Sequence, residues 1–414
     1  TLIDRRNFHL FQPLLYQVAT GGLSPANIAS PLRHVLSRQK NCRVLLGDVL
    51  GFDLSRQMVQ LEQAEVPFDT LIVAAGARHS YFGKDQWEPY APGLKTIEDA
   101  TAIRARVFSA FEAAERESDS AHRREWLNFV IVGGGPTGVE LAGALAEIAH
   151  HSLKYDFRSI DPADAHILLV EAGPRVLAAF PPDLSEKAAA SLARLQVEVR
   201  TGTLVTNVGP TRVSLKHGEE TTVLATRTVL WAAGVQASPL ARALAVSSGA
   251  DLDRAGRITV LKDFSLPQHP EVFVIGDMAH YQHDTEHPLP GVAPAAIQAG
   301  KFVASLISAR QYGKTLPTFA YRDKGSLATI GRSKAVAEIG RFRFGGFFAW
   351  VTWLFVHLME IVTFRNRLLV LLQWAWSYFS YDRSARLITG RSGAESAPLS
   401  EPQHPTVPSD ARPR

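Results

Sequence analysis

The chain has 414 residues, which is enough for two or three domains. Lys and Arg number 44 against 40 Asp and Glu, and a net charge of +4 gives no indication of a nucleic-acid partner. The single cysteine, Cys42, excludes a disulfide framework, a four-cysteine metal centre and a Cys-x-x-Cys redox pair, and we expect no metal site.

Strands and helices alternate along most of the chain, and this alternation predicts parallel sheets. The first residues form a strand that ends at Asp4, and a buried strand lies within 69–78. A charged helix is expected at 98–118, followed by a strand, a glycine turn and a long helix within 126–151. Further strands are expected at 166–170, 197–200, 204–208, 212–216, 221–225, 228–233 and 271–279, and a helix at 294–311.

The segment "VIVGGGPTGVE" contains Gly133-x-Gly135-x-x-Gly138 between an apolar strand and an Ala/Leu-rich helix. In a dinucleotide-binding turn the first glycine allows the turn, the second lets the backbone approach a pyrophosphate, and the third lets helix and strand pack closely. Glu171 ends the next strand, "ILLVE", where a carboxylate binds both adenosine ribose hydroxyls and disfavours a 2′-phosphate. The motif therefore predicts binding of NADH in preference to NADPH.

Three other strands end in small residues and indicate a second nucleotide site. They end at Gly276-Asp277, at Ala75-Gly76 and at Ala233-Gly234. Such an exit lets a ligand approach the backbone closely, and Asp277 lies where a hydroxylated ribityl chain could bind.

The segments "LIDRRNFHLFQPLLYQVATG", "VAAGAR", "VIVGGGPTGVELAGALAE", "VLWAAGV", "FVIGDMA" and "GVAPAAIQAGKFVA", with an arginine- and tryptophan-rich C-terminus, resemble the type II (non-proton-pumping) NADH:quinone oxidoreductases. The resemblance implies an α/β fold with two Rossmann-like dinucleotide-binding domains, for FAD and NADH, and a C-terminal membrane-associating helical segment. It also implies that Asp4 binds the FAD adenosine ribose and that Gln12, Pro13 and Leu14 lie near the isoalloxazine. Ala75, Gly76 and Asp277 would contact the rest of the flavin nucleotide.

On this resemblance the chain divides into five parts. We expect the FAD-binding domain in 1–110 and 241–320, the NADH-binding domain in 111–240, a membrane-anchoring region in 321–391 and a disordered tail in 392–414. The first strand and glycine turn of the FAD unit, about 30 residues, do not precede Asp4, so we expect impaired FAD binding by this chain.

The family chemistry implied by the resemblance is hydride transfer from NADH to the flavin and two-electron reduction of a membrane quinone. Gln298, expected on the first turn of a helix that begins near Ala295, is the candidate contact for a quinone carbonyl, or else an ordinary helix glutamine. Glu140 is expected to tune the nicotinamide or quinone step, unless it is a first-turn glutamate favoured by the helix dipole. Lys324 lies near the flavin–quinone junction by resemblance, with a surface lysine as the alternative.

Residues 341–391 contain seven arginines and four of the seven tryptophans, a composition that suits the headgroup layer of an anionic leaflet. A helix of about 20 residues is expected at 345–364, and small or polar residues form a stripe on it that could pack on the protein: Gly345, Ala349, Thr352, Val356, Glu360 and Thr363. We therefore expect a peripheral, interfacial anchor on the cytoplasmic face of the cell membrane. A single membrane span and a buried homodimer interface are the alternatives, and without a set of spanning helices no proton pumping is expected.

Two other functions remain open from the sequence. One is a flavoprotein reductase for another acceptor such as ferredoxin, against which the apolar C-terminus argues. The other is a non-catalytic, membrane-bound NAD(H)-binding protein, if FAD is not bound.

Overall fold

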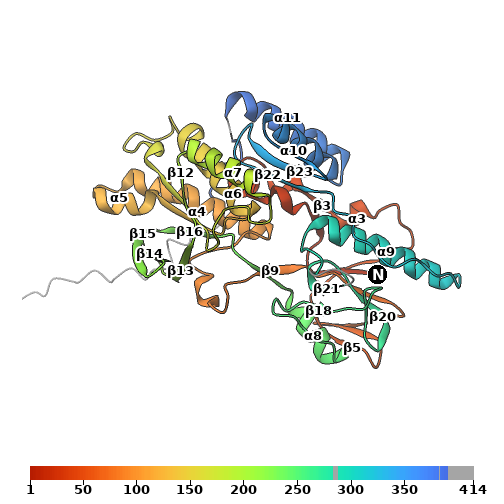
Figure 1. The fold of residues 1–414 in the computed structure, drawn as a ribbon. Helices are drawn as coiled ribbons and strands as arrows, with labels where there is room; N and C mark the ends of the chain where they lie inside the picture. The colour runs from red at the N-terminus through yellow and green to blue at the C-terminus, as the bar shows by residue number, and fades with distance from the viewer. Residues whose placement is uncertain (283–287, 382, 390–414) are drawn as a thin grey trace, which may run out of the picture.

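The computed structural model describes residues 1–282, 288–381 and 383–389 (Figure 1). The predicted disordered tail, 392–414, lies outside these residues. Residues 128–231 contain a four-stranded parallel sheet. From one edge to the other its strands are β12 (Val197–Arg200), β11 (His166–Val170), β10 (Asn128–Val132) and β16 (Thr228–Trp231). The two central strands, β10 and β11, are almost wholly buried, as their apolar runs predict.

Helices pack against this sheet. They are α4 (Ile97–Arg116), α5 (Ser120–Leu127), α6 (Pro136–Glu147) and α7 (Pro182–Arg194). The order β12-β11-β10-β16 brings the carboxyl ends of β10 and β11 side by side, as a dinucleotide-binding fold requires. An antiparallel meander is inserted before β16: β13 (Thr203–Val208), β14 (Arg212–His217) and β15 (Glu220–Ala225).

The second unit is built from segments that precede α4 and segments that follow β16. Its parallel pairs are β1 (Leu2–Asp4) with β4 (Val44–Leu46), β8 (Leu71–Val73) with β20 (His269–Val274), and β18 (Ile258–Thr259) with β21 (Ala279–His280). Its antiparallel strands are β2 (Phe8–Leu10), β3 (Ala29–Pro31), β5 (Val49–Asp53), β6 (Met58–Leu61), β7 (Glu65–Pro67), β9 (Ala77–His79), β17 (Val235–Ala237) and β19 (Ser265–Leu266). Its helices are α3 (Leu32–Val35), α8 (Pro239–Ser248) and α9 (Ala293–Gln311). Two short helices of the N-terminal segment, α1 (Leu15–Ala19) and α2 (Pro25–Ile28), pack instead in the core that contains β10 and α6.

The C-terminal part consists of a small antiparallel sheet with two helices on it. The sheet contains β22 (Ser326–Thr329), β23 (Ala335–Ile339) and β24 (Phe342–Gly346), and the helices are α10 (Phe347–Glu360) and α11 (Phe364–Ser380). In Figure 1 these helices, coloured blue, lie at the top of the molecule. Among the described residues, no helix combines the length and apolar character needed to cross a membrane.

Two expectations for this region are wrong. The stretch 345–364 is not one continuous helix, because α10 ends at Glu360 and α11 begins after the N-cap Thr363. The small-residue stripe is not the buried face either: Ala349 is buried, but Val356 and Glu360 are exposed. Trp353 is buried instead, because its indole ring fills the space between α10 and Tyr16 of α1.

Candidate functional site

The turn after β10 has a different geometry at each of its three motif glycines. Gly133 has φ +107°, and a Cβ there would lie 2.7 Å from the backbone of Ala232. A Cβ at Gly138 would lie 1.8 Å from the Gly133 carbonyl oxygen, so α6 and the turn pack in direct backbone contact. A Cβ at Gly135 would meet nothing within 4 Å, which leaves the N-terminus of α6 open to a ligand.

Glu171 follows β11 and lies beside this turn. Its carboxylate accepts hydrogen bonds from the backbone N–H of Gly134, at 2.5 Å, and of Gly173, at 2.6 Å. The 33-residue distance in sequence between Gly138 and Glu171 is taken up by α6, a π-helical turn at Ile148–Ser152 and the loop that precedes β11. The dinucleotide turn and the strand-end acid are therefore brought together as the sequence predicts.

The residues expected at a flavin nucleotide lie after the ends of β1, β8 and β20. Asp4 is exposed at the end of β1 and accepts the Arg6 backbone N–H at 2.8 Å. The turns after β8 and β20 are joined, because the Ala75 N–H is donated to Sδ of Met278 at 3.2 Å. Gly76 and Gly276 adopt φ +66° and +68° in these turns, and a Cβ at Gly76 would meet nothing within 4 Å.

The other predicted flavin contacts differ in exposure. Gln12, Pro13 and Leu14 form a short 3₁₀ turn in which Leu14 is fully buried and Gln12 donates to the Lys95 carbonyl oxygen at 3.1 Å. Asp277 is half-buried in the short turn that packs against α9. Ala233 and Gly234 follow β16, where Gly234 has φ +71° and lies against the ring of Phe82.

Gln298 and Lys324 are not among the residues that line the pocket containing Glu140. Because α9 begins at Ala293 rather than near Ala295, Gln298 is on its second turn and not on its first. Both atoms of the Gln298 amide bond the backbone of Arg322, Nε2 to its oxygen at 2.9 Å and Oε1 to its N–H at 3.0 Å. Lys324 is exposed two residues further on. The structure therefore brings Gln298 and the segment before β22 together.

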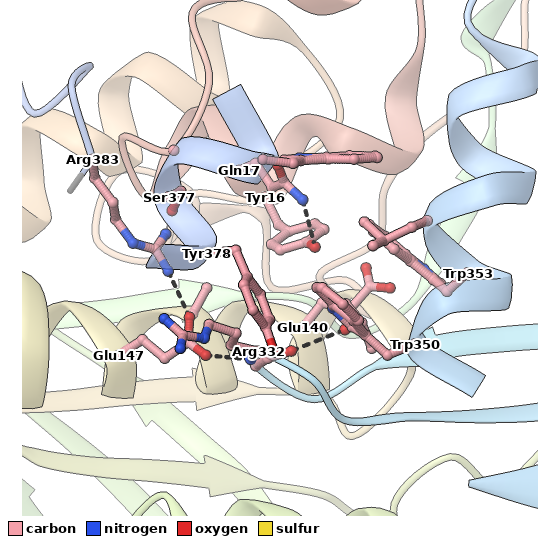
Figure 2. A pocket seen from close by; sticks show the side chains of 16 residues that line it. Tyr16, Gln17, Glu140, Glu147, Arg332, Trp350, Trp353, Ser377, Tyr378 and Arg383 are labelled. Atoms are coloured by element: carbon pink, nitrogen blue, oxygen red, sulfur yellow. Dashed lines mark hydrogen bonds and ion pairs between the residues drawn. The ribbon is translucent and has the colours of Figure 1, made fainter. Parts of the chain in front are cut away.

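Glu140 lines a pocket between α1, α6, α10, α11 and the β22–β23 turn (Figure 2). The pocket encloses about 100 Å³, and five of its sixteen lining residues are aromatic. The residues that line it are Tyr16, Gln17, Gly22, Glu140, Ala144, Glu147, Thr329, Gly331, Arg332, Trp350, Trp353, Leu354, Trp374, Ser377, Tyr378 and Arg383.

The carboxyl group of Glu140 has no cationic partner in this pocket. Burial raises its pKa to about 8, although the backbone of Thr329 and the indole of Trp353 favour the charged form. Burial, and then the nearby Glu140, also raise the pKa of the Tyr16 hydroxyl well above its ordinary value. At neutral pH Glu140 is therefore mostly protonated and able to donate a proton to a ligand in the pocket.

A second glutamate in the pocket, Glu147, is paired with a cation. Glu147, two turns after Glu140 on the same face of α6, forms an ion pair of 2.9 Å with Arg383, and both side chains are nearly buried. Glu147 also accepts the backbone N–H of Arg332, whose guanidinium lies 3.8 Å from the ring of Tyr381. Arg383 is further fixed by a 2.9 Å hydrogen bond to Thr20 Oγ1.

Sequence reasoning identified Glu140 but missed the other pocket residues. One signal was available: Glu147 lies seven residues after Glu140, so both project from one helix face. Arg383 and Trp353 offered no comparable signal, because the contacts that bring them to α6 join segments more than 200 residues apart in the chain.

Comparisons with known proteins agree with this architecture. A family profile described as pyridine nucleotide-disulphide oxidoreductase matches residues 1–300, and one described as NDH2 C-terminal domain matches residues 324–381. The chain is 47% identical, over 94% of its length and 84% of the relative, to a protein of Mycobacterium tuberculosis named type II NADH:quinone oxidoreductase Ndh. It is 44% identical, with the same coverage, to NdhA of that organism. The fold matches a structure of NDH2 from Plasmodium falciparum in complex with NADH, with a TM-score of 0.84 at 18% identity and 94% of each chain covered.

Proposed function

Since the chain belongs to the type II NADH:quinone oxidoreductase family, whose members are flavin enzymes that oxidise NADH and reduce a quinone, we propose that its quinone is reduced in the Glu140 pocket. This membership sets aside the ferredoxin reductase and the non-catalytic NAD(H)-binding protein as alternatives. The observation that carries the proposal is a mostly protonated carboxyl in an aromatic pocket next to the C-terminal helices. A quinone has a flat apolar ring and needs protons as it is reduced, and the pocket matches both requirements.

NADH is proposed to bind at the Gly133 turn. The open N-terminus of α6 at Gly135 offers backbone N–H groups and a partial positive charge to the pyrophosphate. The Glu171 carboxylate is held by two backbone N–H groups, so that its remaining lone pairs face the adjacent space and can accept the adenosine ribose hydroxyls.

FAD is proposed to lie across the ends of β1, β8 and β20. Asp4 would bind the adenosine ribose, Gly76 and Asp277 the central part of the nucleotide, and Gln12 the region of the isoalloxazine. The residues present fit the group, because Asp4 is exposed and the turn at Gly76 has open space where a Cβ would stand. FAD supplies the two-electron chemistry when it is bound.

The C-terminal helices are proposed to lie on an anionic membrane surface, from which a lipid-soluble quinone reaches the pocket. Support comes from the large apolar side chains that α10, α11 and their junction expose: Phe347, Phe348, Val351, Phe355, Val356, Met359, Val362, Phe364, Leu368, Leu369, Leu371, Leu372, Trp376 and Phe379. An apolar surface of this extent is typical of an interfacial anchor. Attachment to the cytoplasmic face and a homodimer stay predictions.

The test is NADH oxidation by the purified chain with two acceptors, a short-chain quinone and ferricyanide, which takes electrons from a flavin without needing protons. Glu140→Gln should lose most quinone reduction and keep ferricyanide reduction. Glu186→Gln, an exposed acid on α7, is the matched control and should retain both. Equal retention of quinone reduction in the two variants would exclude Glu140 as the proton donor.

A further inference from the structure

The indole N–H of Trp353 is buried in the Glu140 pocket without a hydrogen-bond partner. Trp353 is 1% exposed and is among the largest fully buried side chains. Among the described residues, six buried side-chain nitrogen or oxygen atoms lack a partner, and two of them, on Trp353 and Arg332, belong to residues that line this pocket. An unpaired buried donor destabilises a fold, so its presence at a reactive site calls for a role.

The packing around Trp353 holds its ring in one orientation. The ring stacks on that of His357, with centroids 4.2 Å apart and planes at 25°, and it meets Tyr16 and Trp374 edge-on or tilted. His357 Nδ1 donates to the Trp353 carbonyl oxygen at 2.8 Å, and burial lowers the pKa of His357 to about 4. The ring therefore cannot turn its N–H towards water, and His357 is neutral.

This N–H faces the Glu140 carboxyl without reaching hydrogen-bonding geometry (Figure 2). Among the described residues that line the pocket, Nη1 of Arg332 is the other buried side-chain atom that lacks a partner. The hydroxyl of Tyr16 on α1 accepts from Gln17, and Arg383, in the segment after α11, pairs with Glu147 of α6. Arg332, in the β22–β23 turn, lies over the rings of Tyr378 and Tyr381. Because the indole of Trp353 is the side-chain donor that favours the charged form of Glu140, Trp353 is the side chain best placed to respond when Glu140 becomes charged.

We propose that Trp353 is a positioning residue whose N–H closes on the Glu140 carboxylate once Glu140 has given its proton to the bound quinone. The proposal rests on the proposed function of the pocket. Reduction of a quinone to a hydroquinone takes up two electrons and two protons. One proton arrives with the two electrons as a hydride. The second comes from Glu140, whose O–H bond breaks as the quinone oxygen gains its hydrogen, and water reprotonates the carboxylate afterwards.

The test measures the titration of Glu140 in the full chain by infrared difference spectroscopy. The Glu140 signal is identified as the protonated-carboxyl band that Glu140→Gln removes. Because Trp353→Phe deletes a donor to the charged form, it should raise the Glu140 midpoint from about 8 by about one pH unit. The basic limb of the pH profile of quinone reduction should move by the same amount, while ferricyanide reduction keeps its profile.

Two further variants separate this role from packing. Benzothienylalanine at position 353 keeps the shape of the ring but lacks the N–H, so it should reproduce the shift even if Trp353→Phe folds poorly. Trp350→Phe removes another pocket indole and should leave the midpoint in place. Folded variants at position 353 with an unshifted Glu140 band would overturn the proposal. Failure of the proposed function is a separate result, seen as quinone reduction that Glu140→Gln leaves intact.

Discussion

Replacing Glu140 by glutamine should stabilise the protein, and increasingly so as the pH rises. The unfolded chain loses the Glu140 proton near the ordinary pKa of 4.5, whereas the folded chain keeps it up to about 8. Folding therefore becomes less favourable between these two values, and the loss stops growing above pH 8. Linkage gives a destabilisation of about 1 kcal/mol at pH 5, about 3 kcal/mol at pH 7 and about 5 kcal/mol at pH 9. Glutamine keeps the shape of the protonated acid and does not titrate, so the variant escapes this loss.

Chemical denaturation at pH 5, 7 and 9 measures this difference directly, with Glu186→Gln as the control. The expected result is a stability difference between Glu140→Gln and the unsubstituted chain that grows with pH, together with a control that follows the unsubstituted chain. If the difference is constant across the pH range, the carboxyl is not held protonated and the account of the pocket is wrong. A gain in stability with a loss of quinone reduction would be the expected trade-off at a functional acid.

Three other changes test the remaining sites. Gly138→Ala puts a methyl group against the Gly133 carbonyl oxygen and should abolish NADH binding in a fluorescence titration. Gly209→Ala serves as control, because a Cβ there meets only the Arg212 carbonyl oxygen at 3.8 Å. Glu171→Gln should reduce the preference for NADH over NADPH by about tenfold in kcat/KM, and an unchanged ratio would remove Glu171 from the ribose site. Phe348→Glu with Phe379→Glu should prevent co-sedimentation with anionic vesicles and leave ferricyanide reduction intact; continued binding would reject the apolar face as the anchor.

The central sheet could be predicted from sequence because its signals are local. An apolar strand, a glycine turn and an apolar helix follow one another without interruption in β10 and α6, and the strands expected between 197 and 233 all form. Helices α5, α7 and α8 are missing from the sequence-based scheme. The buried face of α10 was also mispredicted. Which face of an apolar helix is buried depends on the surface against which it packs. Here α10 packs against Tyr16, whose ring contacts the indole of Trp353 rather than the small-residue stripe.

Within the candidate site, too, local sequence signals predict some of the residues and long-range contacts determine the others. The Gly133 turn and Glu171 are joined by adjacent parallel strands, so their proximity follows from topology alone. The Glu140 pocket needs α1, α6, α10, α11 and residue 383 at once, and these come from both ends and the middle of the chain. Gln298 was assigned to a quinone carbonyl from its residue type, yet its amide is used to hold the backbone of Arg322. One N–H and one oxygen lone pair of this amide remain for a ligand, so the contact with a quinone carbonyl stays a prediction.

The contrast between Glu140 and Glu147 gives the clearest reason to assign the proton to Glu140. Both acids project from one face of α6 into one pocket, but Glu147 is paired with Arg383 and accepts the Arg332 N–H, whereas Glu140 has no cationic partner. Glu147 therefore contributes structure, because it holds Arg383 and the β22–β23 turn in place. An uncompensated acid in the same desolvated space must stay neutral until a partner takes its proton, and it can then regain a proton at physiological pH. Two glutamates on one helix therefore have different roles because their neighbours differ. The ion pair of Glu147 with Arg383 joins the segment after α11 to α6, and the neutral Glu140 donates the proton.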